Sequence, residues 1–147
     1  MSIFISSLLV FVIDRITKIL VINFVSYPIK VLGDFFILSP TKNYGVSFGL
    51  FSGYPGLVFW ITLAICVFLV VYAVLLKEKS RLFKIGIGLF IGGALGNLVD
   101  RPFGGVIDFI SIGIGNLRWP TFNISDIAIV VGAILIILGK SKTKDIN

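Results

Sequence analysis

The uncharged stretch GLVFWITLAICVFLVVYAVLL, residues 56–76, decides the class of protein that this sequence encodes. As a helix it is long enough to cross a hydrocarbon core of ~30 Å, and no charged residue interrupts it. The rest of the chain has the same character, because 57% of its residues are hydrophobic and only 14% are charged, with a mean hydropathy of +1.09. The sequence therefore predicts an integral membrane protein, and its 147 residues predict a single domain, 1–147.

Three further apolar stretches, residues 3–25, 82–99 and 124–139, predict three more membrane helices. The first stretch has no Lys or Arg before it and no small-residue cleavage site after it, which favours a retained helix over a removable leader. The last stretch would be only ~24 Å long as a helix. We therefore expect its N-terminal end to lie below the membrane surface, among protein groups that satisfy its free amides.

The distribution of cations predicts the orientation of these four helices. Seven of them flank the cytoplasmic side by the positive-inside rule: Lys77, Lys79, Arg81, Lys84, Lys140, Lys142 and Lys144. Both termini are then cytoplasmic, and the connections 26–55 and 100–123 face outward. The net charge of +6 is read as a topology signal, so no nucleic-acid partner is expected. The first outer connection is too apolar for a solvated linker and predicts short strands resting at the interface.

The side chains available for chemistry are few. The chain has no His and one Cys, so we expect neither a metal nor another cofactor. Cys66 lies within the uncharged stretch and is interpreted as structural. Among the acids, Glu78 and Asp145 are expected to be solvated, and Asp34 to be a turn or surface residue. Any catalysis must therefore use the remaining carboxylates, amides and hydroxyls.

Four acidic residues converge on the outer side of the predicted bundle: Asp14, Asp100, Asp108 and Asp126. Ionisable groups within a membrane are costly and usually functional. Asp14 shares a helix face with Lys18, and for these two residues a buried ion pair that orients the first helix is favoured over direct chemistry. Asp100 ends the third span on the same face as Asn97 and Arg101 and predicts a polar cluster at the membrane exit.

The last two acids differ in their surroundings. Asp126 follows Asn123 at a spacing that suits helix capping and catalysis about equally. Asp108 is isolated among apolar residues in the outer connection. Two adjacent carboxylates cannot both ionise easily, so one keeps a proton while the other acts as a base, and such a pair can activate water for peptide hydrolysis. The residue pattern alone leaves open whether Asp100 or Asp108 is the partner of Asp126.

A stripe of small residues along the third predicted helix indicates close helix packing. Gly88, Gly92 and Gly96 recur at four-residue spacing, with Gly93 beside them. We interpret the stripe as packing that draws a neighbouring helix towards Asn97.

Five motifs, taken in order, resemble those of the bacterial lipoprotein signal peptidase family (signal peptidase II, aspartyl peptidase family A8). They are Asp14-Arg15-x-x-Lys18, Asn43-Tyr44-Gly45-Val46-Ser47-Phe48-Gly49, Gly92-Gly93-Ala94-Leu95-Gly96-Asn97-Leu98-Val99-Asp100-Arg101, Val106-Ile107-Asp108-Phe109 and Phe122-Asn123-Ile124-Ser125-Asp126. Each motif alone is weak, but the five together cover nearly the whole chain.

The resemblance implies an aspartic endopeptidase of the bacterial cytoplasmic membrane. Its fold would be all-α and polytopic, with four transmembrane helices, a small extracytoplasmic β cradle and an active site near the outer face. Its substrates would be prolipoproteins, cut just before a Cys that carries diacylglycerol. Membrane lipids are the other expected partners, and a monomer is expected.

The resemblance also assigns roles to individual residues. Asp108 and Asp126 would form the catalytic dyad. The supporting or substrate-positioning residues would be Asn97, Asp100, Arg101, Asn123, Asn43, Asp14 and Lys18. Two departures are visible: Ser125 stands where Ala is common, and the segment 101–106 is short.

Two other functions are compatible with some of these residues. A proton- or ion-coupled transporter also carries membrane carboxylates beside Lys and Arg, although here the acids crowd one face. A magnesium-dependent lipid transferase could use Asn97, Asp100 and Asp108 as oxygen ligands.

Overall fold

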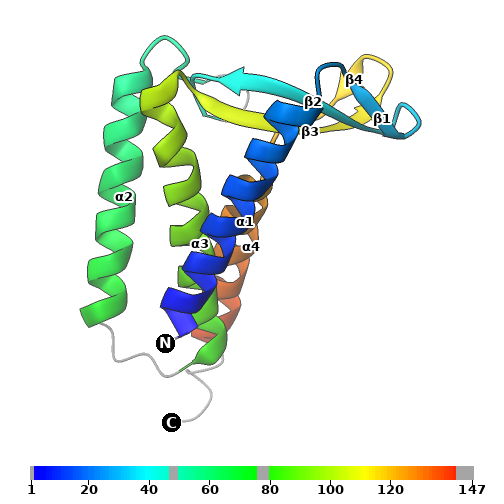
Figure 1. Cartoon of the computed structure of the whole chain (residues 1–147). Helices are drawn as coiled ribbons and strands as arrows, with labels where there is room; N and C mark the ends of the chain where they lie inside the picture. Colours follow the sequence, from blue (N-terminus) through cyan, green and yellow to red (C-terminus); the bar gives the residue numbers. More distant parts are fainter. Residues whose placement is uncertain (1, 47–49, 76–79, 142–147) are drawn as a thin grey trace.

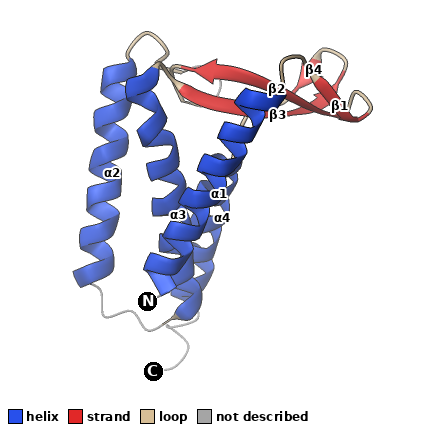
Figure 2. Cartoon of the chain, in the orientation of Figure 1, coloured by secondary structure: helices blue, strands red, loops and turns tan. Residues whose placement is uncertain are grey.

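The structure is a computed structural model that describes residues 2–46, 50–75 and 80–141 of the chain. Within these residues the chain is mostly helical, with a small antiparallel sheet (Figure 1, Figure 2). The helices are α1 (Ser2–Phe24), α2 (Pro55–Leu75), α3 (Arg81–Asp100), the short 3-10 helix η2 (Arg101–Phe103) and α4 (Ile124–Ser141). The strands are β1 (Ile29–Leu32), β2 (Phe36–Asn43), β3 (Val106–Ile114) and β4 (Leu117–Arg118). The four long helices coincide with the four predicted ones to within one or two residues.

Helix α3 is the centre of the bundle, because α1 and α4 both pack closely against it. Its glycines lie on two faces. A Cβ added at Gly92 would lie 2.5 Å from the carbonyl oxygen of Ser7 in α1, and one added at Gly93 would meet the carbonyl oxygen of Ser125 in α4. The glycine stripe therefore serves packing, as predicted, but it admits two neighbouring helices rather than one.

The sheet has the strand order β1-β2-β3-β4 and extends sideways from one end of the helix bundle (Figure 1). Leu38 pairs with Ile110 and Thr41 with Asp108, so β2 takes one more residue than β3 between these two pairs. This β-bulge contains Pro40, which cannot donate a backbone hydrogen bond to the ladder. Strands β1 and β2 confirm the strands predicted in the first connection. Strands β3 and β4 lie in the second connection, where the sequence analysis predicted none.

The sheet joins the bundle through an apolar cluster. Val21 and Val25 at the end of α1 are buried against Phe109 and Ile110 of β3. This contact fixes β3, and with it Asp108, across the end of the helices.

Helix α1 has an apolar exposed surface and buried charged residues. In α1, Asp14 and Lys18 are buried, whereas Ile16 and Leu20 are exposed. A helix on the surface of a soluble protein has the opposite distribution, so this pattern indicates a lipid environment. Two segments, Pro55–Leu75 and Arg81–Phe103, are long and apolar enough to cross a membrane.

The other two long helices do not meet the same criterion, for reasons that are visible in their sequences. Helix α1 carries Asp14, Arg15 and Lys18, and the apolar part of α4, Ile124–Gly139, is short. All four predicted helices are thus present, but only two of them qualify as spans by length and composition among the described residues. The four-span arrangement stays a prediction.

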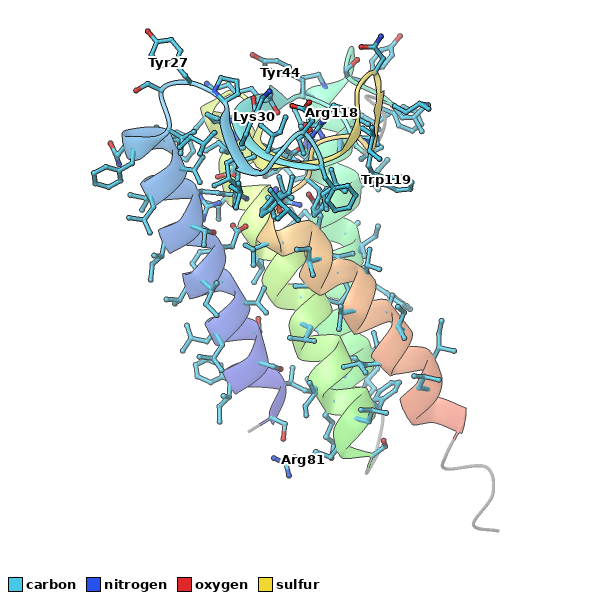
Figure 3. The ribbon with its side chains drawn as sticks, turned by 90° about the vertical axis from the view of Figure 1, so that its right-hand side faces the viewer. Tyr27, Lys30, Tyr44, Arg81, Arg118 and Trp119 are labelled. Carbon is cyan, nitrogen blue, oxygen red and sulfur yellow. The ribbon has the colours of Figure 1, made fainter. Side chains whose placement is uncertain are left out.

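The two ends of the bundle differ in composition. Figure 3 places Arg81 at one end and Tyr27, Tyr44 and Trp119 at the other, where the sheet lies. Lys77, Lys79, Lys142 and Lys144, on which the predicted orientation partly depends, lie outside the described residues, as do Glu78 and Asp145. Helix α1 begins and α4 ends at the end opposite the sheet (Figure 1), and the side of the membrane that this end faces stays a prediction.

The close approach of α1 to α3 gives a stability test. Gly92→Ala should lower the free energy of unfolding by about 1–3 kcal/mol, because the added methyl group forces the backbone of Ser7 away. Gly56→Ala in α2 is the matched control, since an added Cβ there meets no atom within 4 Å. Denaturant unfolding of the detergent-solubilised protein measures both, and equal stability of the two variants would contradict the packing role.

Candidate active site

Asp108 and Asp126 lie in one cavity although they come from different elements. Asp108 is buried in β3, and Asp126 is in the first turn of α4. Both line a cavity of about 500 Å³ at the sheet end of the bundle. Asn123 links them, because its Nδ2 donates to Asp108 Oδ1 at 2.7 Å and its backbone N–H donates to Asp126 Oδ2 at 3.0 Å. The structure thus places these two predicted site residues together.

The carboxylate of Asp126 caps its own helix and also faces the cavity. Its backbone N–H donates to Asn123 Oδ1 at 3.0 Å, and the reciprocal bond from Asn123 completes a capping pair. The other carboxylate oxygen, Oδ1, accepts a hydrogen bond from Asn97 Nδ2 at 2.8 Å. The capping interpretation is therefore confirmed, and the same hydrogen bonds fix the orientation of a carboxylate that lines the cavity.

Asp108 is held from both sides by amides. Asn43 at the end of β2 donates to Asp108 Oδ2 at 3.0 Å, opposite the bond from Asn123. Burial, followed by the negative charge of Asp126, raises the pKa of Asp108 to about 6, and the hydrogen bonds from Asn43 and Asn123 oppose this rise. A carboxyl group with this pKa can hold or release a proton near neutral pH.

A buried ion network lies beside the two carboxylates. Lys18 Nζ is 2.9 Å from Asp14 Oδ2 and 2.8 Å from Asp100 Oδ2, and the three side chains are almost fully buried. Arg15 also bridges these two acids, at 2.9 Å from Asp14 and 2.6 Å from Asp100. The predicted Asp14–Lys18 ion pair is present. The sequence analysis did not predict that Arg15 belongs to this network, although a cation inside an apolar stretch indicates a buried ion pair.

The structure separates Asp100 from Asp108, which the residue pattern could not do. Both carboxylate oxygens of Asp100 are occupied by the cations Arg15 and Lys18, and Asp100 is not among the residues that line the cavity. Asp108 lines it and contacts Asn43 and Asn123. Asp108 is therefore the acid that shares the cavity with Asp126.

Asp14 also contributes to the start of α4. Its Oδ1 accepts a hydrogen bond from the backbone N–H of Ser125 at 3.2 Å. This is one of the protein groups expected to satisfy the free amides at the buried end of the last helix. The hydroxyl group of Ser125 is buried without a hydrogen-bond partner among the described residues, facing Gly96.

The short segment between α3 and β3 is a compact turn. Helix η2 is followed by Gly104 and Gly105, whose φ angles of 92° and 97° are accessible mainly to glycine. The turn leads directly into β3, so the shortness of this segment does not prevent Asp108 from reaching the cavity. Arg101, also on the cavity wall, donates to the carbonyl oxygen of Gly45 at 3.1 Å and so ties this turn to the first connection.

The walls of the cavity are largely apolar and come from three helices and the sheet. Ile65 of α2, Ala94 of α3 and Val130 of α4 lie along it, with Trp119 and Phe122 from the segment between β4 and α4. Figure 3 shows Trp119 at the sheet end of the bundle. Sequence analysis missed these wall residues, because single apolar residues carry no distinguishing signal in so apolar a chain.

Two solved structures have the same fold. One is described as a bacterial membrane enzyme structure by the in meso method at 2.3 Å resolution, with a TM-score of 0.86 and 30% identity over 99% of this chain and 91% of that chain. The other, described likewise at 1.9 Å resolution, has a TM-score of 0.81 and 30% identity over 92% of this chain and 90% of that chain. The chain thus has the fold of a bacterial membrane enzyme.

Sequence comparisons narrow this class to one family. The family model for signal peptidase (SPase) II matches residues 6–141. The lipoprotein signal peptidase of Clostridium novyi (strain NT) is 39% identical over 129 residues, which cover 85% of this chain and 87% of that protein. That of Burkholderia mallei (strain SAVP1) is 38% identical over 141 residues, covering 89% and 82%. The chain belongs to the signal peptidase II family.

The ion network gives a second stability test. Asp100→Asn should lower the free energy of unfolding by about 3–5 kcal/mol, because Arg15 and Lys18 lose a buried counter-charge. Asp34→Asn is the control, since Asp34 pairs with Lys30 on the exposed surface and should give no measurable change. Thermal unfolding in detergent compares the two, and similar losses would argue against a structural role for the network.

Proposed function

We propose that this protein is a membrane aspartyl endopeptidase that removes the signal peptide from diacylglyceryl-modified bacterial prolipoproteins, cutting just before the lipidated Cys. Family membership supports the substrate class. The observation that carries the mechanism is the pair of carboxylates, Asp108 and Asp126, in one cavity with Asn123 between them.

The proposed chemistry needs one proton shared by the pair. The ionised carboxyl group takes a proton from a water molecule as this water attacks the scissile carbonyl carbon. The protonated partner donates a hydrogen bond to the developing oxyanion and later protonates the leaving amine. The raised pKa of Asp108 supports this division, because it allows one proton to remain on the pair near neutral pH.

The surroundings of the pair support a substrate that arrives from the membrane. The apolar side chains of Ile65, Ala94 and Val130 continue the cavity along the helices away from the two carboxylates. A hydrophobic signal helix lying against them would bring the bond at its outer end to the dyad, and its position in the membrane would select the bond to be cut.

The other residues of the site are proposed to support the dyad or the substrate. Asn97 and Asn123 orient the carboxylates, and Asn43 holds Asp108. Asp14, Lys18 and Asp100 form the buried network beside them, and Arg101 holds the backbone of Gly45 at the cavity wall. We propose a single-domain monomer with four spans in the cytoplasmic membrane, both termini in the cytoplasm and the dyad near the outer face.

The dyad is tested by cleavage of a diacylglyceryl-modified prolipoprotein with purified protein, with and without a chelator. Asp108→Asn and Asp126→Asn should each lower kcat by about 10³-fold or more, because each removes a proton acceptor or donor. Cleavage by the wild type should resist the chelator.

Asp100→Asn is the comparison variant for this assay. The folded fraction of this variant should keep measurable cleavage activity. Full activity in either dyad variant would refute the mechanism. Absence of cleavage by the wild type would favour a transporter, and loss of cleavage with the chelator would favour a metal-dependent enzyme.

The pKa of Asp108 predicts the pH dependence of cleavage. Above about pH 6 the unliganded pair loses the proton that the mechanism requires, so kcat/KM should decline as the pH rises through this value. Rates measured at low substrate concentration between pH 5 and 8 test the expectation. A flat profile over this range would be incompatible with it.

Asn43→Ala supplies an internal check on the assignment of this ionisation to Asp108. Asn43 donates a hydrogen bond that favours the ionised carboxylate, so its removal should raise the pKa and move the decline of kcat/KM to higher pH. A shift to lower pH would assign the ionisation to another group.

A further inference from the structure

Asn97 lies at the junction of the ion network and the dyad, and its side chain makes three hydrogen bonds. Its Oδ1 accepts from Lys18 Nζ at 3.1 Å and from Asn123 Nδ2 at 3.0 Å. Its Nδ2 donates to Asp126 Oδ1 at 2.8 Å. Both ends of this buried amide are therefore engaged, one by the network and one by a dyad carboxylate.

The direction of the amide depends on its neighbours, because the two ends of an asparagine side chain have nearly the same shape. An ammonium group can only donate, so the end of the Asn97 amide that faces Lys18 must be the oxygen. The N–H₂ end is then directed at Asp126. Asn123, a neutral donor, favours the same direction. Both bonds to Asn97 Oδ1 are buried, but only the bond from Lys18 is charge-assisted.

Lys18 also prevents a competing arrangement. Its ammonium lies against Asp14 Oδ2 and Asp100 Oδ2, at 2.9 and 2.8 Å. If the ammonium were absent, these two carboxylates would attract the N–H₂ group of Asn97 and so compete with Asp126 for it. Lys18 thus occupies the acceptors that would otherwise turn the amide round.

We infer that Lys18 is a positioning residue of the dyad, which acts through Asn97 to hold the carboxylate of Asp126 in its working orientation. The inference rests on the proposed function and extends it, because it gives a buried cation of α1 a defined partner and a defined effect. Lys18 is not among the residues that line the cavity, so its effect should appear in kcat rather than in KM.

The test compares Lys18→Met with Arg15→Met in the prolipoprotein cleavage assay. Both variants remove a cation that bridges Asp14 and Asp100, but of the two cations it is Lys18 that donates a hydrogen bond to Asn97. Lys18→Met should lower kcat by about 100-fold with little change in KM, as expected when a reacting group is displaced. Arg15→Met should lose stability and keep a much larger share of kcat. Equal losses of kcat would overturn the inference, because they would assign the effect to the network as a whole.

A double-mutant cycle tests the route through Asn97. In the Asn97→Leu background, Lys18→Met should cause little further loss of kcat, because the bond to Asp126 is already absent. Independent, multiplicative losses would overturn the proposed route. If Lys18→Met does not fold, the charge-balanced variant Asp14→Asn/Lys18→Met takes its place, and full kcat in that variant would count against the inference.

The same assay separates this inference from the proposed function. Asp126→Asn serves as the inactive reference. Failure of the wild type to cleave would overturn both proposals. Cleavage that is abolished by Asp126→Asn but shows multiplicative losses for Lys18→Met and Asn97→Leu would overturn the role of Lys18 alone.

Discussion

The rest of this structure depends on the contacts of the buried Lys18 ammonium group. Through them Lys18 of α1 binds two residues of α3, Asp100 and Asn97, at the level where α4 begins. Charges removed from water are costly unless they are paired and hydrogen-bonded, and here two cations meet two acids. The pairing fixes the relative positions of α1 and α3, and Asp14 extends it to α4 through the backbone of Ser125.

Asp126 shows how one set of hydrogen bonds can serve both folding and chemistry. Its exchange of bonds with Asn123 closes the first turn of α4, and the same exchange leaves one carboxylate oxygen directed at Asn97. A cap needs a fixed side-chain rotamer, and so does a catalytic carboxylate. The orientation required for the proposed reaction is therefore already maintained by the local stability of the helix.

The sequence predicted the helices well because each depends on a local property, the length and continuity of an apolar stretch. The capping pair of Asn123 and Asp126 was equally local, since it requires only a three-residue spacing. The strand that carries Asp108 could not be found in the same way. Its existence depends on pairing with β2, more than sixty residues earlier in the chain, and its burial depends on Val21 and Val25 of α1. The choice between Asp100 and Asp108 depended on those distant contacts.

The bulge at Pro40 limits where residues can be inserted into or deleted from the first two strands. Thr41 lies opposite Asp108, and Asn43 reaches the same carboxylate, only because β2 has gained one residue on β3 after Leu38. Side chains alternate between the faces of a strand, so losing or gaining a residue between Leu38 and Thr41 would turn Asn43 to the opposite face. The turn at Gly33, at the far end of the sheet, is under no such constraint. Within β1, β2 and their turn, insertions and deletions compatible with the site are therefore confined to the turn at Gly33, and the segment between the bulge and Asn43 must keep a constant number of residues.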